Sequence, residues 1–102
     1  MQLFAKRKMD VIVQAPAHRL VTDIFDRHGA SGYTVLTAQS GRGLTGPWDA
    51  QPVTLARQQV MVVAVLDDGL VEPILADIQD LFADYHGIVY LSTVEVLRAE
   101  RF

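Results

Sequence analysis

The stretch Gly29-Ala30-Ser31-Gly32-Tyr33-Thr34-Val35-Leu36-Thr37-Ala38-Gln39-Ser40-Gly41-Arg42-Gly43 decides the fold, because it contains a helix stop, a short β-branched strand and a glycine-rich loop in that order. A glycine after an apolar helical stripe is typical of a helix end, and Val and Thr favour strands. The glycines that flank Arg42 let backbone N–H groups and a guanidinium approach one anion. The stretch therefore predicts a helix-to-strand junction followed by an anion-binding loop.

Hydrophobic periodicity on both sides of this stretch extends the pattern. Apolar residues between Leu20 and Phe25 recur at helical spacing, and a second such stripe begins at Val71. The acidic segment Asp67-Asp68-Gly69 offers an N-cap to the second helix. The expected elements are strands at 8–14, 33–39, 58–66 and 88–97, helices at 18–28 and after 69, and a long loop without periodicity from Ser40 to about Thr54.

The order of these elements predicts one α+β domain over residues 1–102 with the ferredoxin-like βαββαβ fold, a four-stranded antiparallel sheet with both helices on one face. The segment Val60-Met61-Val62-Val63-Ala64-Val65-Leu66 is apolar on both faces of its strand, although two helices cover only one face of such a sheet. The sequence therefore predicts a homo-oligomer whose sheets pack against each other. The alternative is a monomer with an apolar face.

Composition excludes several classes of protein. Of the 102 residues 50% are apolar, which suffices for a core, but the longest apolar run, Val60 to Leu66, is too short to cross a bilayer. The N-terminal segment lacks the apolar region of a signal peptide, so we expect a cytoplasmic protein that is not embedded in a membrane. The absence of cysteine excludes disulfides, thiolate catalysis and Cys-based metal sites.

The charges are unevenly distributed, although the net charge is only −3. Six acids and no Lys or Arg lie between Asp67 and Asp84, a distribution that disfavours nucleic acid. The cations gather at Lys6-Arg7-Lys8, at Arg42, and near the end at Arg98 and Arg101. We expect the first three, together with Arg57, to be solvated surface residues. The other local positive sites suit a small anion better than DNA or RNA.

Three motifs follow one another along the chain. They are Ser31-Gly32-Tyr33-Thr34-Val35 before the glycine-rich loop, Leu66-Asp67-Asp68 before the second helix, and Val94-Glu95-Val96-Leu97-Arg98 in the closing strand. In this order they resemble the P-II signalling superfamily. The resemblance covers essentially the whole chain. It implies a trimer of ferredoxin-like subunits that binds an adenine nucleotide in the clefts between neighbours. It also implies a non-enzymatic signalling protein whose T-loop, here about residues 40–57, docks or releases a target protein.

The resemblance further implies which residues bind the nucleotide. The family positions around the adenine match Ile12, Thr34 and Ala64, and those near the phosphates match Gly41, Arg42, Gly43, His86, Gly87 and Arg98. The family's lysine in the turn before the last strand is missing here. Glu100 stands at the family's second arginine position, with Arg101 one place along. Fewer cations favour ADP or AMP over ATP.

Departures from the nitrogen-regulating members narrow the subtype. The segment 40–57 is shorter than theirs and has no tyrosine that could be uridylylated. The chain resembles instead the P-II-like proteins associated with carboxysomes and bicarbonate uptake. This resemblance implies bicarbonate as a second ligand and a bicarbonate transporter or carboxysome-related protein as the target. Ser40, Gly41 and Arg42 form the predicted bicarbonate site, because hydrogen-bond donors are dense there. Trp48 is predicted either to contact the partner or to anchor the loop on its own subunit.

Other functions of this fold have less support. The three histidines lie on separate elements, with His28 on the apolar helix stripe, and no Ser/His/acid set is indicated. The aromatics of an RNA-recognition strand and the cysteine pair of a heavy-metal chaperone are both absent. The main alternative is a trimeric ferredoxin-like protein that binds a metal or a small metabolite at a subunit cleft, without nucleotide. In that case Gly41 and Gly43 are turn glycines.

Overall fold

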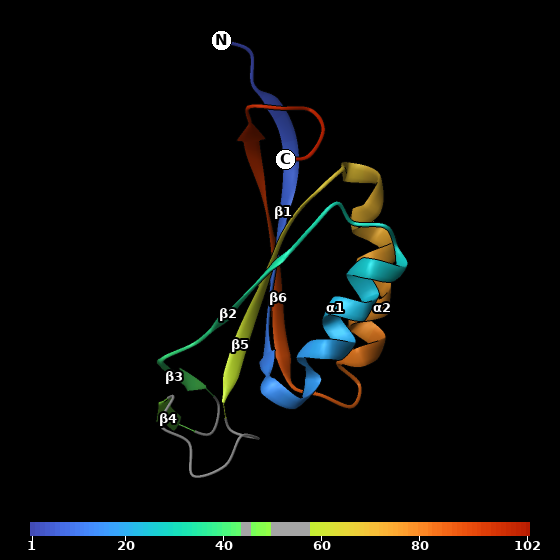
Figure 1. Cartoon of the computed structure of the whole chain (residues 1–102). Helices are drawn as coiled ribbons and strands as arrows, with labels where there is room; N and C mark the ends of the chain where they lie inside the picture. The colour runs from blue at the N-terminus through green and yellow to red at the C-terminus, as the bar shows by residue number, and fades with distance from the viewer. Residues whose placement is uncertain (44–45, 50–57) are drawn as a thin grey trace.

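The structure consists of one sheet with two helices packed on one of its faces (Figure 1). The computed structural model describes residues 1–43, 46–49 and 58–102. The elements are β1 (Phe4–Gln14), η1 (Ala15–Ala17), α1 (His18–Arg27), β2 (Thr34–Thr37), β3 (Ser40–Gly43), β4 (Gly46–Asp49), β5 (Gln59–Leu66), η3 (Asp68–Leu70), α2 (Val71–Leu81) and β6 (Gly87–Val96). The predicted order is confirmed, with β3 and β4 as additions and with shifts of up to four residues at the element ends.

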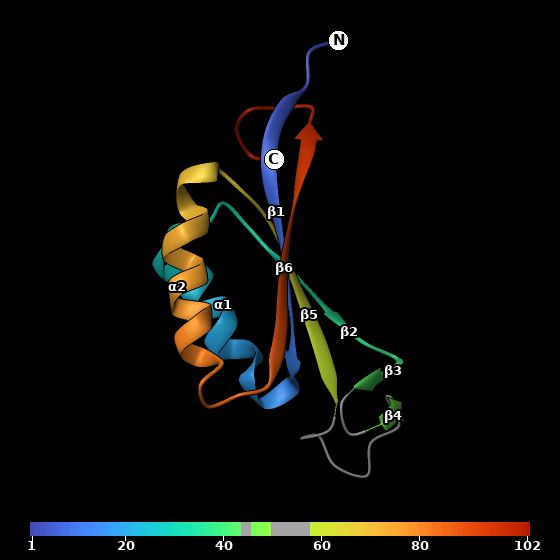
Figure 2. The same cartoon turned by 180° about the vertical axis from the view of Figure 1, so that it is seen from behind.

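The main sheet has the strand order β2-β5-β1-β6, and every neighbouring pair is antiparallel. β1 is the long central strand, which pairs with β6 from Phe4 to Val13 and with β5 from Arg7 to Gln14. The view from behind shows α1 and α2 side by side on the same face of the sheet (Figure 2). This arrangement is the ferredoxin-like fold that the sequence predicts.

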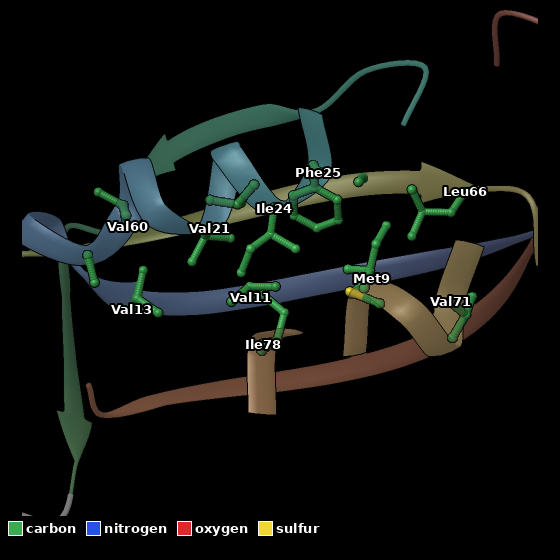
Figure 3. Packing of buried hydrophobic residues seen from close by; sticks show 14 residues of the cluster. Met9, Val11, Val13, Val21, Ile24, Phe25, Val60, Leu66, Val71 and Ile78 are labelled. Carbon is green, nitrogen blue, oxygen red and sulfur yellow. The ribbon is translucent and has the colours of Figure 1, made fainter. Parts of the chain in front are cut away.

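The hydrophobic core lies between the sheet and the helices (Figure 3). Its main residues are Met9, Val11 and Val13 from β1, Val21, Ile24 and Phe25 from α1, Val60, Val62, Ala64 and Leu66 from β5, and Val71, Ile74 and Ile78 from α2. Burial alternates strictly along β5, because successive side chains of a strand point to opposite faces. The helix that supplies Phe25 stops as predicted at Gly29, whose φ of 76° lies in the left-handed region that favours glycine.

The face of the sheet away from the helices, which we call the open face, carries an apolar surface. Cross-strand pairs on this face join Leu36 to Met61, Met61 to Ile12, and Ile12 to Ile88. Leu36 is 49% exposed and Ile88 is 59% exposed. Neither described helix covers this row (Figures 1 and 2). The prediction that the third main strand is apolar on both faces is confirmed, and exposed apolar side chains in a row are typical of an interaction surface.

The loop predicted after β2 contains a β-hairpin in its described part, which corrects the expectation of a segment without strands. β3 and β4 pair antiparallel, with Gly41 opposite Trp48. The glycines and the proline in these two short strands hide the pattern, because both residue types are rare in strands. Residues 44–45 and 50–57 of the predicted T-loop lie outside the described residues.

The acidic pair before α2 binds β1 and does not cap the helix, contrary to the prediction. No side-chain capping hydrogen bond is present at the start of η3 or of α2. Asp67 accepts a hydrogen bond from Lys6, and Arg7 Nη1 donates to Asp68 Oδ1 at 3.3 Å. Lys8 pairs with another acid of β1. The three N-terminal cations are thus ion-paired, which corrects the expectation of solvated surface residues. Asp67 and Asp68 come from a distant segment, whereas Asp10 lies two residues from Lys8.

An acid on α2 joins the two helices at the C-terminal end of α1. Asp77 Oδ2 lies 2.6 Å from His28 Nε2 and accepts a hydrogen bond of 3.1 Å from Arg27 Nη2. His28 is therefore the C-cap residue of α1 and faces α2, which corrects its assignment to the apolar stripe. The pKa of Asp77 lies below its ordinary value, mainly because of the hydrogen bond with His28 and next because of the hydrogen bond from Arg27.

We expect the stabilising contribution of Asp77 to depend on pH. Because the folded state lowers the pKa of this carboxyl group, the contribution is complete above the ordinary value of 3.8 and is lost as the pH falls through the folded value. Asp77→Asn should therefore lower the free energy of unfolding more at about pH 6 than at about pH 3. Urea denaturation measures the difference, with Asp80→Asn on the exposed side of α2 as the control. Equal losses at both pH values would contradict the pairing.

Candidate functional site

One end of the sheet, which we call the hairpin end, gathers most of the predicted phosphate-binding residues. β1 ends there, β5 begins with Gln59, β6 begins with Gly87, and the β3–β4 hairpin extends from the same end (Figure 1). Two backbone hydrogen bonds connect these segments. Ala15 N–H donates to the Gln58 carbonyl at 2.7 Å, and Ala38 N–H donates to the Gln59 carbonyl at 2.9 Å. These bonds hold the end of β1 and the segment after β2 to the start of β5.

Ile12 and Gly87 lie against each other at the hairpin end. Ile12 pairs with Ile88, the residue that follows Gly87. A β-carbon on Gly87 would lie 2.9 Å from the Ile12 carbonyl oxygen and 2.6 Å from carbons of the Phe82 ring. The site therefore requires glycine for this close approach. His86 is exposed immediately before it, so the turn presents an imidazole and bare backbone at the same end as the hairpin.

The hairpin carries the predicted anion-binding residues. Ser40 and Arg42 are exposed, and Gly41 is half-buried. Within the described part of the chain, no ion pair involves Arg42. Its guanidinium is exposed beside the backbone of Gly41 and Gly43, and its role in binding an anion stays a prediction. The backbone of Trp48 lies opposite Gly41, and the role of its side chain stays a prediction.

The other predicted cations lie at the opposite end of the sheet. β6 ends at Val96, and Arg98 and Arg101 follow in a tail that turns back towards β1 (Figures 1 and 2). Both arginines are exposed. Because β6 has ten residues, its two ends are roughly 30 Å apart. A single protomer therefore does not bring Arg42 and Arg98 onto one nucleotide.

The side chains of Thr34 and Ala64, two of the predicted adenine contacts, point to opposite faces of the sheet. Thr34 pairs with Val63 on the open face and is exposed. Ala64 pairs with Met9, faces the helices and is 2% exposed. The structure does not bring these two side chains together, and the contacts assigned to both residues stay predictions.

A polar pair in the middle of the open face was not anticipated from the sequence. Asp10 lies opposite Tyr90 and is only 2% exposed. Lys8 Nζ lies 3.2 Å from Asp10 Oδ2, whereas Oδ1 has no hydrogen-bond partner among the described residues. The signal that could have revealed this pair is a lone acid within the apolar run from Met9 to Val13.

Two other kinds of site find no support among the described residues. Residues 1–43, 46–49 and 58–102 contain no group of three or more His, Asp or Glu side chains that could hold a metal ion. None of the helices in these ranges has the length and apolar character that a membrane crossing needs. A hollow of about 600 Å³ lies between Arg7 and the start of α2, and no predicted nucleotide-binding residue lines it.

The whole fold is closely similar to solved structures of CPII, a nitrogen regulatory PII-like protein from Thiomonas intermedia K12. CPII bound to ADP, AMP and bicarbonate superposes with a TM-score of 0.89 and 27% sequence identity, over 99% of this chain and 96% of that chain. CPII bound to ADP and bicarbonate gives a TM-score of 0.88 and 28% identity, over 99% and 97% of the two chains. A putative PII-like signaling protein from Thermus thermophilus, at 23% identity, shares the fold with a TM-score of 0.85, over 100% and 99%.

The sequence was also compared with curated proteins and with family models. No curated protein is detectably similar to it. The family model described as nitrogen regulatory protein P-II matches residues 6–101. This range includes both helices, nearly all of the main sheet, the hairpin end and the tail up to Arg101. With this match over nearly its whole length, the chain belongs to the nitrogen regulatory protein P-II family.

Proposed function

We propose that this chain is a regulatory protein that binds ADP or AMP, together with bicarbonate, in the clefts between the copies of a homotrimer. The observation that carries the proposal is the similarity to CPII, which was solved with ADP, AMP and bicarbonate bound. The similarity extends over 96% of the CPII chain. Proteins of the P-II family act in signalling. We extend this role to inorganic-carbon and energy status, which a partner protein would read from the bound ligands.

The separation of the cations supports a cleft between copies. The phosphates of a nucleotide are bound by several donors, each of which lies within hydrogen-bond distance of a phosphate oxygen. In one protomer, however, Arg42 and Arg98 lie at opposite ends of the sheet (Figure 1). A neighbouring copy whose tail lies beside the hairpin end would supply the missing cation. The exposed apolar row of Leu36 and Ile88 offers such a neighbour a surface for packing.

The hairpin end fits a nucleotide with few phosphates. The turn before β6 reads Asp84-Tyr85-His86-Gly87 and offers an exposed imidazole but no lysine. ADP or AMP brings less negative charge to this turn than ATP does. Bicarbonate is a small planar anion that a guanidinium can bind with two parallel hydrogen bonds. We assign it to Arg42, with the Gly41 backbone and the Ser40 hydroxyl as further donors.

Ligand-dependent ordering of the hairpin would carry the signal. A ligand that contacts the hairpin in one conformation shifts the population towards that conformation. A partner that binds only this conformation then responds to the ligand, and linkage requires the partner to raise the ligand's affinity in return. We propose a cytoplasmic setting, a bicarbonate transporter or carboxysome-related protein as the partner, and Trp48 as a contact with it.

Isothermal titration calorimetry tests the coupling between the two ligands. We expect bicarbonate to tighten ADP binding about fivefold or more, because both ligands stabilise the same hairpin conformation. Sodium chloride at equal ionic strength controls for charge screening. An ADP affinity that does not change with bicarbonate would contradict the bicarbonate site.

A thermal-shift panel with ADP, AMP, ATP, divalent metals and small metabolites tests the choice of ligand class. Selective binding to the native state raises the melting temperature. We expect ADP and AMP to raise it more than ATP, and more than the metals. A shift with a metal or metabolite and none with nucleotides would overturn the nucleotide proposal in favour of the alternative without nucleotide.

A further inference from the structure

The tail after β6 is attached to β1 through Phe102. Lys6 Nζ lies 4.4 Å from the centroid of the Phe102 ring, a cation–π distance. Both views show the tail beside β1 at this end of the sheet (Figures 1 and 2). Residues 97–101 are exposed, whereas Phe102 is half-buried. The ring is thus the part of the described tail that rests on the sheet.

Lys6 is held by a carboxylate as well as by the ring. Its side chain is only 12% exposed, which is unusual for a lysine. The ammonium pairs with Asp67, the residue that follows β5, so a carboxylate fixes it from a second segment of the chain. A cation that is already fixed loses little conformational freedom when an aromatic ring covers it. Lys6 is therefore an anchor for Phe102 that Asp67 holds from a second segment of the chain.

The backbone of the tail supplies a second, independent observation. Arg101 has a φ of 54°, which places it in the left-handed region that residues with a β-carbon seldom adopt. Such a conformation persists where surrounding contacts hold it. Arg101 directly precedes Phe102, whose ring contacts Lys6. The left-handed turn therefore lies next to this contact.

We propose that Lys6, fixed by Asp67, and Phe102 form a clamp that holds the tail in position and presets Arg98 and Arg101 for the phosphates of the bound nucleotide. The inference rests on the proposed nucleotide function. A released tail samples many conformations. The apparent affinity for the nucleotide is then the intrinsic affinity multiplied by the fraction of molecules whose tail is competent to bind. Lys6 and Phe102 are thus positioning residues, and neither needs to contact the ligand.

Limited proteolysis and titration test the clamp together. Trypsin cleaves the peptide bond after Arg98. Mass spectrometry of the product 1–98 measures the rate of this cleavage separately from cleavage at other sites. In Phe102→Ala and in Lys6→Met we expect this cleavage to accelerate about three- to fivefold, and ADP affinity to fall by a similar factor. Phe102→Trp should slow the cleavage, because Trp gives the strongest cation–π contact. Phe102→Leu, which keeps an apolar side chain without the ring, should resemble the alanine variant.

Asp68→Asn is the matched control, because it removes the neighbouring ion pair with Arg7 without touching the tail. Circular dichroism of each variant checks that the fold is retained. Unchanged cleavage after Arg98 in both Phe102→Ala and Lys6→Met would overturn the clamp. Faster cleavage with unchanged ADP affinity would overturn its role in presetting the arginines. If the wild-type chain binds no adenine nucleotide, the proposed function and the presetting role fail together, while the cleavage rates still decide whether the clamp exists.

Discussion

Gly87→Ala is expected to lower the free energy of unfolding by about 1–3 kcal/mol, the usual cost of forcing an extra carbon into a packed site. The new β-carbon would lie 2.6 Å from the Phe82 ring and 2.9 Å from the Ile12 carbonyl oxygen. The ring can turn aside, but the carbonyl belongs to the central strand β1 and is held by its neighbours in the sheet. β6 must therefore move away from β1 at its first residue.

Chemical denaturation of Gly87→Ala measures this loss, with Gly69→Ala as the matched control. A β-carbon on Gly69 would meet no atom within 4 Å, and its backbone does not have the positive φ that only glycine accepts readily. Gly69→Ala should therefore change the free energy of unfolding little. Equal effects of the two substitutions would show that the close approach of the turn to Ile12 is not what constrains position 87.

Arg98→Ala is expected to weaken ADP binding by roughly 10- to 100-fold, the range for losing a hydrogen bond from a charged donor to phosphate. The residue lies in the exposed tail and packs into no core, so its removal should leave the fold intact. Titration of the variant with ADP gives the affinity, and light scattering shows whether the assembly keeps its mass.

Arg19→Ala provides the control for a general loss of positive charge. Arg19 is exposed near the start of α1, which follows the end of β1, and it is not among the predicted nucleotide-binding residues. Its removal lowers the net charge by the same amount, so a merely electrostatic attraction would weaken equally in both variants. An ADP affinity that is unchanged in Arg98→Ala would remove this residue from the site.

Local signals in the sequence were sufficient for most of the fold. Gly29 marks the end of α1 correctly, because the left-handed backbone there is one that glycine adopts without strain. The two-faced apolar run of β5 correctly indicates a sheet with a second apolar surface. The role of Asp67 was misjudged because its partner, Lys6, lies 61 residues away in the sequence. Capping is a local pattern, and the competing ion pair exists only after the sheet has formed.

The positions of the site residues were harder to predict than the fold. The glycines around Arg42 indicate an anion-binding loop by their own chemistry, whereas the assignment of Arg98 depends on the resemblance to the P-II family. Because β5 is apolar on both faces, its residues do not show which of them face the helices. The burial of Ala64 therefore became visible only in the structure. The separation of Arg42 from Arg98 follows from the length and direction of β6, which local patterns do not report.

The distance between the hairpin and the tail of one protomer has a genetic consequence. Under the proposed arrangement, with each nucleotide bound between two copies, a copy altered at Arg98 would still lend an intact hairpin to its neighbour, and a copy altered at Arg42 would still lend an intact tail. In a cell that makes both versions, mixed assemblies would regain some complete clefts by complementation. Two alleles that are each defective alone would then restore part of the response when they are expressed together.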